Sequence, residues 1–514
     1  MRGILFAVVA VAVLSAFVAG QSDAAETASD GSVYWYETYG VAHPDYYCVI
    51  TDAESEADVL HVPAVLEGYD VRSISSGAFD GCDAKTIVIP GGVQTICEGA
   101  FTGCGRLEDA YFLGDRPEMD GAFSEGVAFH SFEDADGWEG SETIAVAESG
   151  GVKYAMLPDG AIAIGGTPVD GVLRIASQVA GTRVVSIGPY AFAGSMRADG
   201  EVDRRSDISE AVLPESLLKI GQRAFYYSDL ERISVPGSLE AVEDEAFRAC
   251  YALEGFDLPV SVSYIGFEAF RDCRSLEEVT VPAGASIGDG AFYICSSLKS
   301  AEVSSVPDRA FGYCSSLESV HIGSAAESVG NMAFYRCYSL KEAKIPDSVV
   351  SVGKEAFFDC SSLDVLCLGS VETIGKAAFR GCISLSEVAV PASVTALGGY
   401  AFADCVSLKD VIAEGACPEG DDTVFLNDPA TVTCSEEHVS SWKDSAFGLP
   451  VKSDRPAGLE PALILACVLA VLVAVAVLVA IIRRRRGRKS RLFPSVFIIF
   501  KNSPPRTHSL YYAF

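Results

Sequence analysis

The stretch "IGKAAFRGCISLSEVAVP", residues 374–391, contains an Ala-Phe pair, a cysteine three residues after the phenylalanine, and an apolar strand that ends in proline. The same skeleton returns 23 residues later as "LGGYAFADCVSLKDVIAEG" and occurs earlier as "VGKEAFFDCSSLDVLCLG". A motif that recurs at fixed spacing predicts a stack of structural repeats, because one short unit cannot bury its own apolar side chains.

Ala-Phe pairs run through most of the chain. Their alanines are Ala78, Ala100, Ala122, Ala191, Ala224, Ala246, Ala269, Ala291, Ala310, Ala333, Ala356, Ala378 and Ala401. Within each unit, a segment such as "LEEVTVP" alternates apolar and polar residues, which predicts a short half-buried strand. We therefore expect a β-rich repeat solenoid with short strands and turns or short helices in each unit of 22 or 23 residues. The recurring Phe and Cys should face neighbouring coils.

The averaged unit, L-x-x-V-x-[IV]-P followed by I-G-x-x-A-F-x-x-C, resembles the BspA-like leucine-rich repeat family of cell-surface proteins. The resemblance covers about 71–123 and 184–425. It implies a secreted or surface-anchored adhesin or receptor that binds a host or matrix protein or another cell. It implies no particular ligand.

The repeats fall into two blocks, 21–150 and 151–448. Each block begins with a polar hairpin, a strand and a glycine turn, and each ends with a tryptophan after an acidic run. Solenoids need end caps of this kind to cover their last exposed core. We expect opening caps at 46–79 and 152–192, and closing caps at 127–140 and 430–447.

Both ends of the chain carry targeting features. Residues 1–20 have one arginine and a short apolar run, which indicates a signal peptide, with an uncleaved anchor as the alternative. After a linker, 449–461, the uncharged apolar segment 462–482 is long enough to span a bilayer as a transmembrane helix. The basic tail, 483–514, then predicts the cytoplasmic side. We therefore expect a single-pass plasma-membrane protein with its N-terminal part extracellular, typical of a bacterium.

The formal net charge of −32 disfavours nucleic acid as a partner, because an acidic surface repels phosphates. The six histidines are scattered without metal-ligand spacing, and no phosphate-binding glycine loop occurs. We therefore expect no enzyme activity, no metal and no cofactor.

Ten of the sixteen cysteines occupy a single repeat position. They are Cys82, Cys104, Cys250, Cys273, Cys295, Cys314, Cys337, Cys360, Cys382 and Cys405. Buried thiols, pairing between neighbouring coils and metal binding are all compatible with such a column. Outside the column, Cys417 and Cys434 in the closing cap are candidates for a disulfide.

With no catalytic motif, function is expected on outward-facing repeat positions. The middle residue of each strand points away from the core, and tyrosines recur after the Ala-Phe pairs. Candidate partner-binding residues are Asp257, Thr280, Glu302, His321 and Lys344 on the strands, and Tyr293, Tyr313 and Tyr335 on the turns. A solvated strand face and tyrosines packed between coils are the alternatives. The sequence thus favours a membrane-anchored extracellular protein that binds a macromolecular partner; the alternative is a structural envelope or spacer protein that self-associates.

Overall fold

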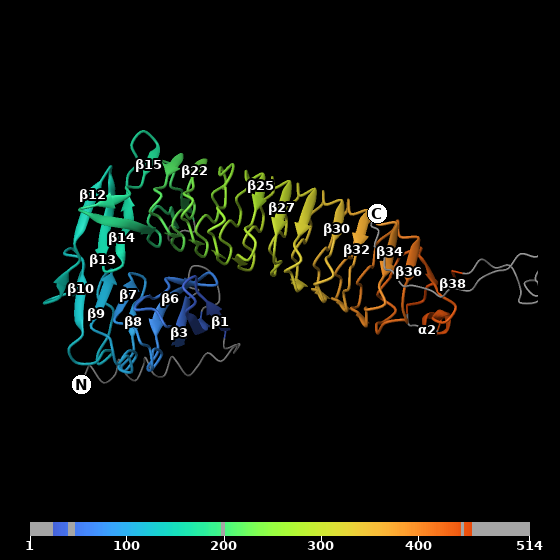
Figure 1. Ribbon diagram of the computed structural model, residues 1–514, viewed down its shortest axis with the longest axis horizontal. Coiled ribbons are helices and arrows are strands. Elements are labelled where there is room, and N and C mark those ends of the chain that lie inside the picture. The colour runs from blue at the N-terminus through green and yellow to red at the C-terminus, as the bar shows by residue number, and fades with distance from the viewer. Residues whose placement is uncertain (1–23, 40–46, 197–200, 444–446, 455–514) are drawn as a thin grey trace, which may run out of the picture. The chain divides into compact units, whose positions relative to one another are not determined.

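The computed structural model describes residues 24–39, 47–196, 201–443 and 447–454. They form β-solenoid coils, and within each of the two blocks successive coils stack on one another (Figure 1). In this part of the chain, helical structure is confined to α2, Val439–Lys443. The Ala-Phe segments therefore form turns, and the short helices considered from the sequence are absent from the described coils.

The signal peptide, the membrane span and the basic tail predicted from the sequence lie outside the described residues. Within the described ranges, no helix has the length and apolar character needed to cross a bilayer.

The first block is built from two sheets. One begins with antiparallel strands β1, β2 and β3 and continues into the coils. The other is wholly parallel. The first sheet has the order β1 (Ala24–Thr27), β2 (Val33–Tyr39), β3 (Tyr47–Glu54), β6 (Tyr69–Ile74), β5 (Val65–Leu66), with β8 (Thr95–Ile96) beside β6; the second has β11 (Glu142–Thr143), β10 (Ala128–Ser131), β9 (Asp109–Leu113), β7 (Thr86–Pro90), β4 (Val59–His61).

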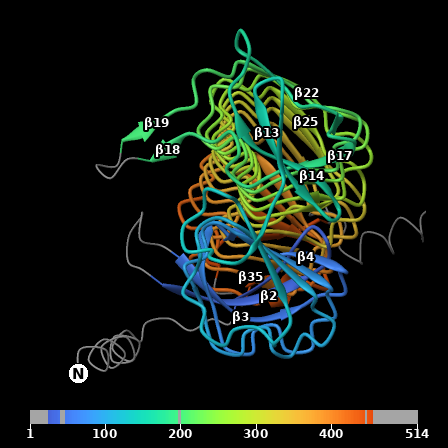
Figure 2. The ribbon, with the colours of Figure 1, turned by 90° about the vertical axis from the view of Figure 1, so that its left-hand side faces the viewer.

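The second block opens with antiparallel strands β12 (Val146–Ser149), β13 (Val152–Leu157) and β14 (Gly160–Gly166) and then becomes parallel (Figure 2). One side of its coils begins with the longer strand β17 (Thr182–Ile187), which is flanked by β16 (Gln178–Val179), and continues in two-residue strands. These are β21 (Lys219–Ile220), β23 (Ala241–Val242), β24 (Tyr264–Ile265), β26 (Ser286–Ile287), β29 (Ser328–Val329), β31 (Ser351–Val352), β33 (Thr373–Ile374) and β35 (Ala396–Leu397).

A second side carries the longer strands, on which the outward residues lie. They are β15 (Val172–Arg174), β20 (Glu210–Val212), β22 (Arg232–Ser234), β25 (Glu278–Thr280), β27 (Ser300–Val303), β28 (Ser319–Ile322), β30 (Glu342–Lys344), β32 (Val365–Cys367), β34 (Glu387–Val390), β36 (Asp410–Ala413), β37 (Thr431–Cys434) and β38 (Val451–Ser453). Strands β18 (Ser195–Met196) and β19 (Val202–Asp203) pair antiparallel between the first two Ala-Phe coils of this block. Because β38 pairs with β37, the ladder extends into the segment 449–461 that the sequence analysis treats as a linker.

The Ala-Phe turns form the third side of each coil, and their phenylalanines make one continuous stack. From Phe247 to Phe270 to Phe292, the ring centroids are 5.3 and 5.4 Å apart with nearly parallel planes. The stack continues to Phe425 in the last coil. These rings are shielded by neighbouring coils, as the repeat pattern predicts.

All ten column cysteines are buried free thiols. Nine of them donate a hydrogen bond from Sγ to the carbonyl of the phenylalanine one coil earlier, for example Cys295 to Phe270 at 3.2 Å. The interpretation as buried thiols is therefore confirmed. The disulfide considered between Cys417 and Cys434 is wrong, because Cys434 is a free, buried thiol whose Sγ lies near the Lys452 carbonyl, at 4.0 Å.

In most coils of the second block, the third residue before the alanine of the Ala-Phe pair is a glycine, and the close approach of adjacent coils requires it there. A Cβ on Gly353 would lie 2.6 Å from the Asn331 backbone nitrogen, and one on Gly398 would lie 2.4 Å from that of Lys376. The lack of a side chain at this position is what lets the coils stack at this spacing.

Candidate interaction surface

The longer strands of the second block present an outward row of side chains. Thr280 of β25 pairs with Glu302 of β27, and Glu302 pairs with His321 of β28, all in parallel register. Lys344 of β30 continues the row and pairs with Cys367 of β32. All five side chains are exposed, while the flanking residues of each strand point inward. The row is thus a set of neighbouring side chains that the core does not use.

Ion pairs between adjacent strands border this row. Lys299 Nζ lies 2.7 Å from Glu277, and Lys341 Nζ lies 2.6 Å from Glu318. These pairs are exposed, so they add little to stability. They do give the strand face an alternating pattern of charge that is neither strongly acidic nor strongly basic.

Asp257 differs from the other candidates on the strands. Its side chain is exposed, as predicted, but the residues around it form no strand. The row is therefore regular from Thr280 to Cys367 and interrupted before it.

The corresponding row of the first block is covered. Val88 of β7 is buried with Ala155, Leu157 and Ile162 of the β13–β14 hairpin in a small hydrophobic cluster. His61 of β4 lies 2.9 Å from Asp159, in the turn of that hairpin. The β13–β14 hairpin of the second block thus covers the first block's outward row, whereas the second block's own row is exposed to solvent.

The candidate tyrosines form an aromatic ladder along the turns. Tyr293, Tyr313 and Tyr335 have ring centroids 5.5 and 5.3 Å apart, and Phe358 stacks on Tyr335 at 5.0 Å. The guanidinium of Arg336 lies 5.6 Å from the Tyr313 ring and 5.2 Å from the Tyr335 ring. All three tyrosines are half-buried, so packing between coils takes part of each ring.

The two sets of candidates belong to different stretches of each coil. Parallel pairing brings the strand candidates together, and ring contacts bring the tyrosines together. In the described part of the chain, no hydrogen bond, ion pair or ring contact joins one set to the other. Partner binding by either set stays a prediction.

The two blocks also contact each other along a lateral seam that the sequence analysis missed. We define this seam as the contact of β1 and the 64–70 segment with the turns at 187–190, 220–223, 242–245 and 264–268. The side-chain amide of Gln222 accepts hydrogen bonds from the Ala64 and Val65 N–H groups at 2.6 and 2.9 Å, and donates to the Val65 carbonyl at 2.7 Å.

Arg223 makes the second anchor of the seam. It donates to the Gly68 carbonyl at 2.8 Å and to the Tyr190 hydroxyl at 2.7 Å, and it forms ion pairs with Asp70 and Glu245. Burial acts against its charge, but the neighbouring carboxylates raise the pKa of Arg223 well above its usual value. The sequence holds a signal for this seam: Gln222 and Arg223 occupy the two variable positions before an Ala-Phe pair, and Glu243 stands where most coils of the second block have glycine.

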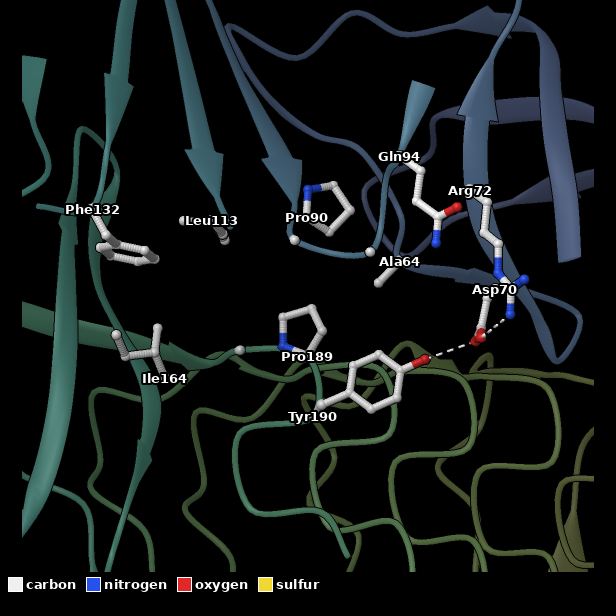
Figure 3. Close-up of a pocket in the computed structure, with 13 residues that line it drawn as sticks. Ala64, Asp70, Arg72, Pro90, Gln94, Leu113, Phe132, Ile164, Pro189 and Tyr190 are labelled. Carbon is white, nitrogen blue, oxygen red and sulfur yellow. Dashed lines mark hydrogen bonds and ion pairs between the residues drawn. The ribbon is translucent and has the colours of Figure 1, made fainter. Parts of the chain in front are cut away.

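A cavity of about 530 Å³ lies beside the seam (Figure 3). Leu113, Phe132 and Ile164 line one end, and Gln94 and Arg72 line the other. The Tyr190 hydroxyl donates to Asp70 at 2.9 Å across the two blocks. The cavity walls come from both blocks, so its shape depends on the seam being closed.

Fold and surface together define a leucine-rich repeat solenoid with an open strand face. A family model for the BspA type leucine rich repeat region matches residues 67–124, 186–306 and 304–432, in six copies. The chain belongs to this family. No curated protein sequence matches it.

Several solved structures are similar to this chain. The leucine rich repeat protein TpLRR of T. pallidum is 29% identical over 38% of this chain and 91% of its own, with a TM-score of 0.34. A leucine rich cell surface protein of Faecalibacterium prausnitzii is 18% identical over 85% and 97%, with a TM-score of 0.28. The pneumococcal vaccine antigen PcpA is 17% identical over 85% and 100%, with a TM-score of 0.32. Superposition is partial in each case, so the family assignment rests on the repeat model.

Proposed function

We propose that this protein is displayed at the cell surface and binds an extracellular protein or another cell surface, without catalysis, through the outward row of the second block. One observation supports it above the others. The first block's row is packed against a hairpin, whereas Thr280, Glu302, His321 and Lys344 remain exposed in register. Adjacent side chains that the core does not bury are available to a partner.

The placement in the membrane belongs to the same proposal. It is supported by the apolar segment 462–482 and the basic residues that follow it. The family to which the chain belongs supports a cell-surface binding protein as the class. The mixed charge of the row favours a polypeptide or glycoprotein surface as the partner over a uniformly charged polymer.

The test is adhesion of the full-length chain, in vesicles, to a panel of matrix proteins and host and bacterial cell surfaces. A charge-reversed double variant, Glu302→Lys with Lys344→Glu, should weaken the binding that the panel reveals at least about tenfold, because charge complementarity at an interface is lost. The matched control is Glu372→Lys with Lys376→Glu, which reverses two exposed charges outside the row and should bind like the unmodified chain.

Equal binding by both double variants would contradict use of the row. No binding to any surface in the panel, together with concentration-dependent self-association, would favour the alternative of a spacer protein.

A further inference from the structure

Two carboxyl groups from different blocks meet in the seam. Glu26 lies on β1 of the first block, and Asp244 lies in the turn after β23 of the second. Their carboxyl groups lie within hydrogen-bonding reach of each other, and Asp244 is fully buried. A hydrogen bond between them requires that one of them carry a proton, because two ionised carboxylates have no donor.

The other hydrogen bonds of the two carboxyl groups leave one oxygen of Asp244 without a donor. Glu26 Oε2 accepts the Glu67 N–H at 2.8 Å, and Asp244 Oδ1 accepts the Phe267 N–H at 2.8 Å and the Tyr264 hydroxyl at 3.3 Å. Asp244 Oδ2 is buried and has no donor among the described groups. A carboxylic proton shared with Glu26 supplies the missing donor.

Among the described residues, neither Glu26 nor Asp244 forms an ion pair with a cation. The titratable groups that face Glu26 and Asp244 are acids, phenols and one thiol. They are Glu67, Tyr36 and Cys48 from the first block and Glu243, Glu245 and Tyr264 from the second. The nearby bases lie beside other carboxylates. Arg223 forms ion pairs with Glu245 and Asp70. The charges of Lys219 and His61 act to lower the pKa of Glu243, which also accepts a hydrogen bond from Ser29.

We propose that the lateral seam is a pH-dependent latch, closed while Glu26 and Asp244 share a proton and loosened once both are ionised. This inference is independent of the proposed binding function, since it concerns only contacts within the chain.

Electrostatics agree with this geometry. Burial first, and then the charge of Asp244, raise the pKa of Glu26 well above its usual range. Burial, with added repulsion from Glu243 and Glu245, raises the pKa of Asp244 to about 7, even though its hydrogen bonds act in the opposite direction.

The direction of the pH effect follows from linkage. In the open latch, both carboxyls face water and titrate near their usual values of about 4. In the closed latch, Asp244 ionises at a pKa of about 7, and Glu26 keeps its proton beyond that pH because the charge of Asp244 raises the pKa of Glu26 further. The closed form therefore binds up to two more protons than the open form between about pH 4 and 7 and one more above about pH 7, so the opening constant should rise by at least about tenfold per pH unit below pH 7 and go on rising above it.

Hydrogen exchange of the full-length chain measures this opening directly. The Ala64 and Val65 amides donate across the seam to Gln222, so they report on the latch. The Phe357 amide, which donates to the Ala378 carbonyl at 2.7 Å inside the ladder, serves as the reference. After correction for intrinsic rates, we expect protection of the seam amides to fall by at least about tenfold per unit from pH 5 to 7 and to go on falling above pH 7, while that of the reference changes much less.

Variants separate the latch from general effects of pH. In Asp244→Asn, the amide N–H can donate to the Glu26 carboxylate, and only one of the two buried carboxyls still titrates, so protection should fall less steeply with pH than in the unmodified chain. Glu26→Gln should behave the same way from the other block. The matched control is Asp364→Asn, which removes an exposed carboxylate outside the seam and should retain the full slope.

Protection in the unmodified chain that is flat from pH 5 to 7 would overturn the proposal, as would a full slope in both seam variants. Restoration of protection at pH 8 by calcium, reversed by a chelator, would also overturn it, because the pair would then be a cation site.

Discussion

The thiol of Cys295 donates a hydrogen bond to the carbonyl of Phe270, one coil earlier, at 3.2 Å. The same carbonyl accepts the Cys273 N–H, also at 3.2 Å. The column cysteine thus fills space beneath the phenylalanine stack and supplies a second donor to a buried carbonyl. This relationship explains why the repeat keeps a cysteine at a position where no disulfide forms.

Replacement of Cys295 by alanine should destabilise the array by about 1–3 kcal/mol, because it leaves a small cavity and removes a buried hydrogen bond. Urea unfolding monitored by fluorescence checks this. Ser296→Ala, one residue away and half-buried, is the control and should change the midpoint little. Equal midpoints for the two variants would show that the thiol has no structural role.

Thiol labelling should separate the cysteines by burial. Cys367 is exposed on β32 and should react rapidly with a disulfide reagent in the native protein, whereas the column thiols should react only on unfolding. Burial raises the pKa of Cys250 to about 12, so little of its reactive thiolate exists at neutral pH. Rapid labelling of most cysteines, or a need for reductant before the unfolded chain labels, would contradict the buried free-thiol column.

Gly353→Ala should cost about 1–3 kcal/mol of stability, because the new Cβ would clash with the preceding coil's backbone, which cannot move aside easily. Gly255→Ala is its matched control, since a Cβ at Gly255 meets nothing within 4 Å. Thermal unfolding of both variants tests the pair. A control as unstable as Gly353→Ala would mean that coil spacing is not the cause.

We predict a pH effect on stability at the C-terminal end of the second block, caused by Asp428. Burial raises its pKa to about 7, and neither carboxylate oxygen has a hydrogen-bond donor among the described groups. Because the folded-state pKa is raised, the stability of this end should fall as pH increases from about 4 to about 7. Asp428→Asn should remove that loss, measured as exchange protection of β37 at pH 5 and 8. A variant with the same slope as the unmodified chain would assign the effect to other groups.

The array could be predicted from sequence because each coil repeats the same residues for the same reason. Phe270, Cys295 and the strand of Thr280 obey local rules of period and burial, and the structure follows them. The seam could not be predicted in this way. Gln222 bonds residues 157 and 158 positions away, and no periodic pattern encodes a contact between two blocks.

The closing caps could be predicted from the sequence only in part. Trp138 and Trp442 were noted from sequence as cap residues. In the structure, each donates its indole N–H to a glycine carbonyl, Gly114 at 3.1 Å and Gly415 at 3.0 Å. Residue type indicated a cap, but the hydrogen bond that positions each ring depends on the path of the preceding coil.

Hydrogen exchange of the full-length chain, with and without a surface protein to which it adheres, tests the proposed binding most directly. We expect partner-dependent protection to centre on β25, β27, β28 and β30, whose outward side chains are Thr280, Glu302, His321 and Lys344. Protection confined to the tyrosine turns or to the first block, with these four strands unchanged, would contradict the account.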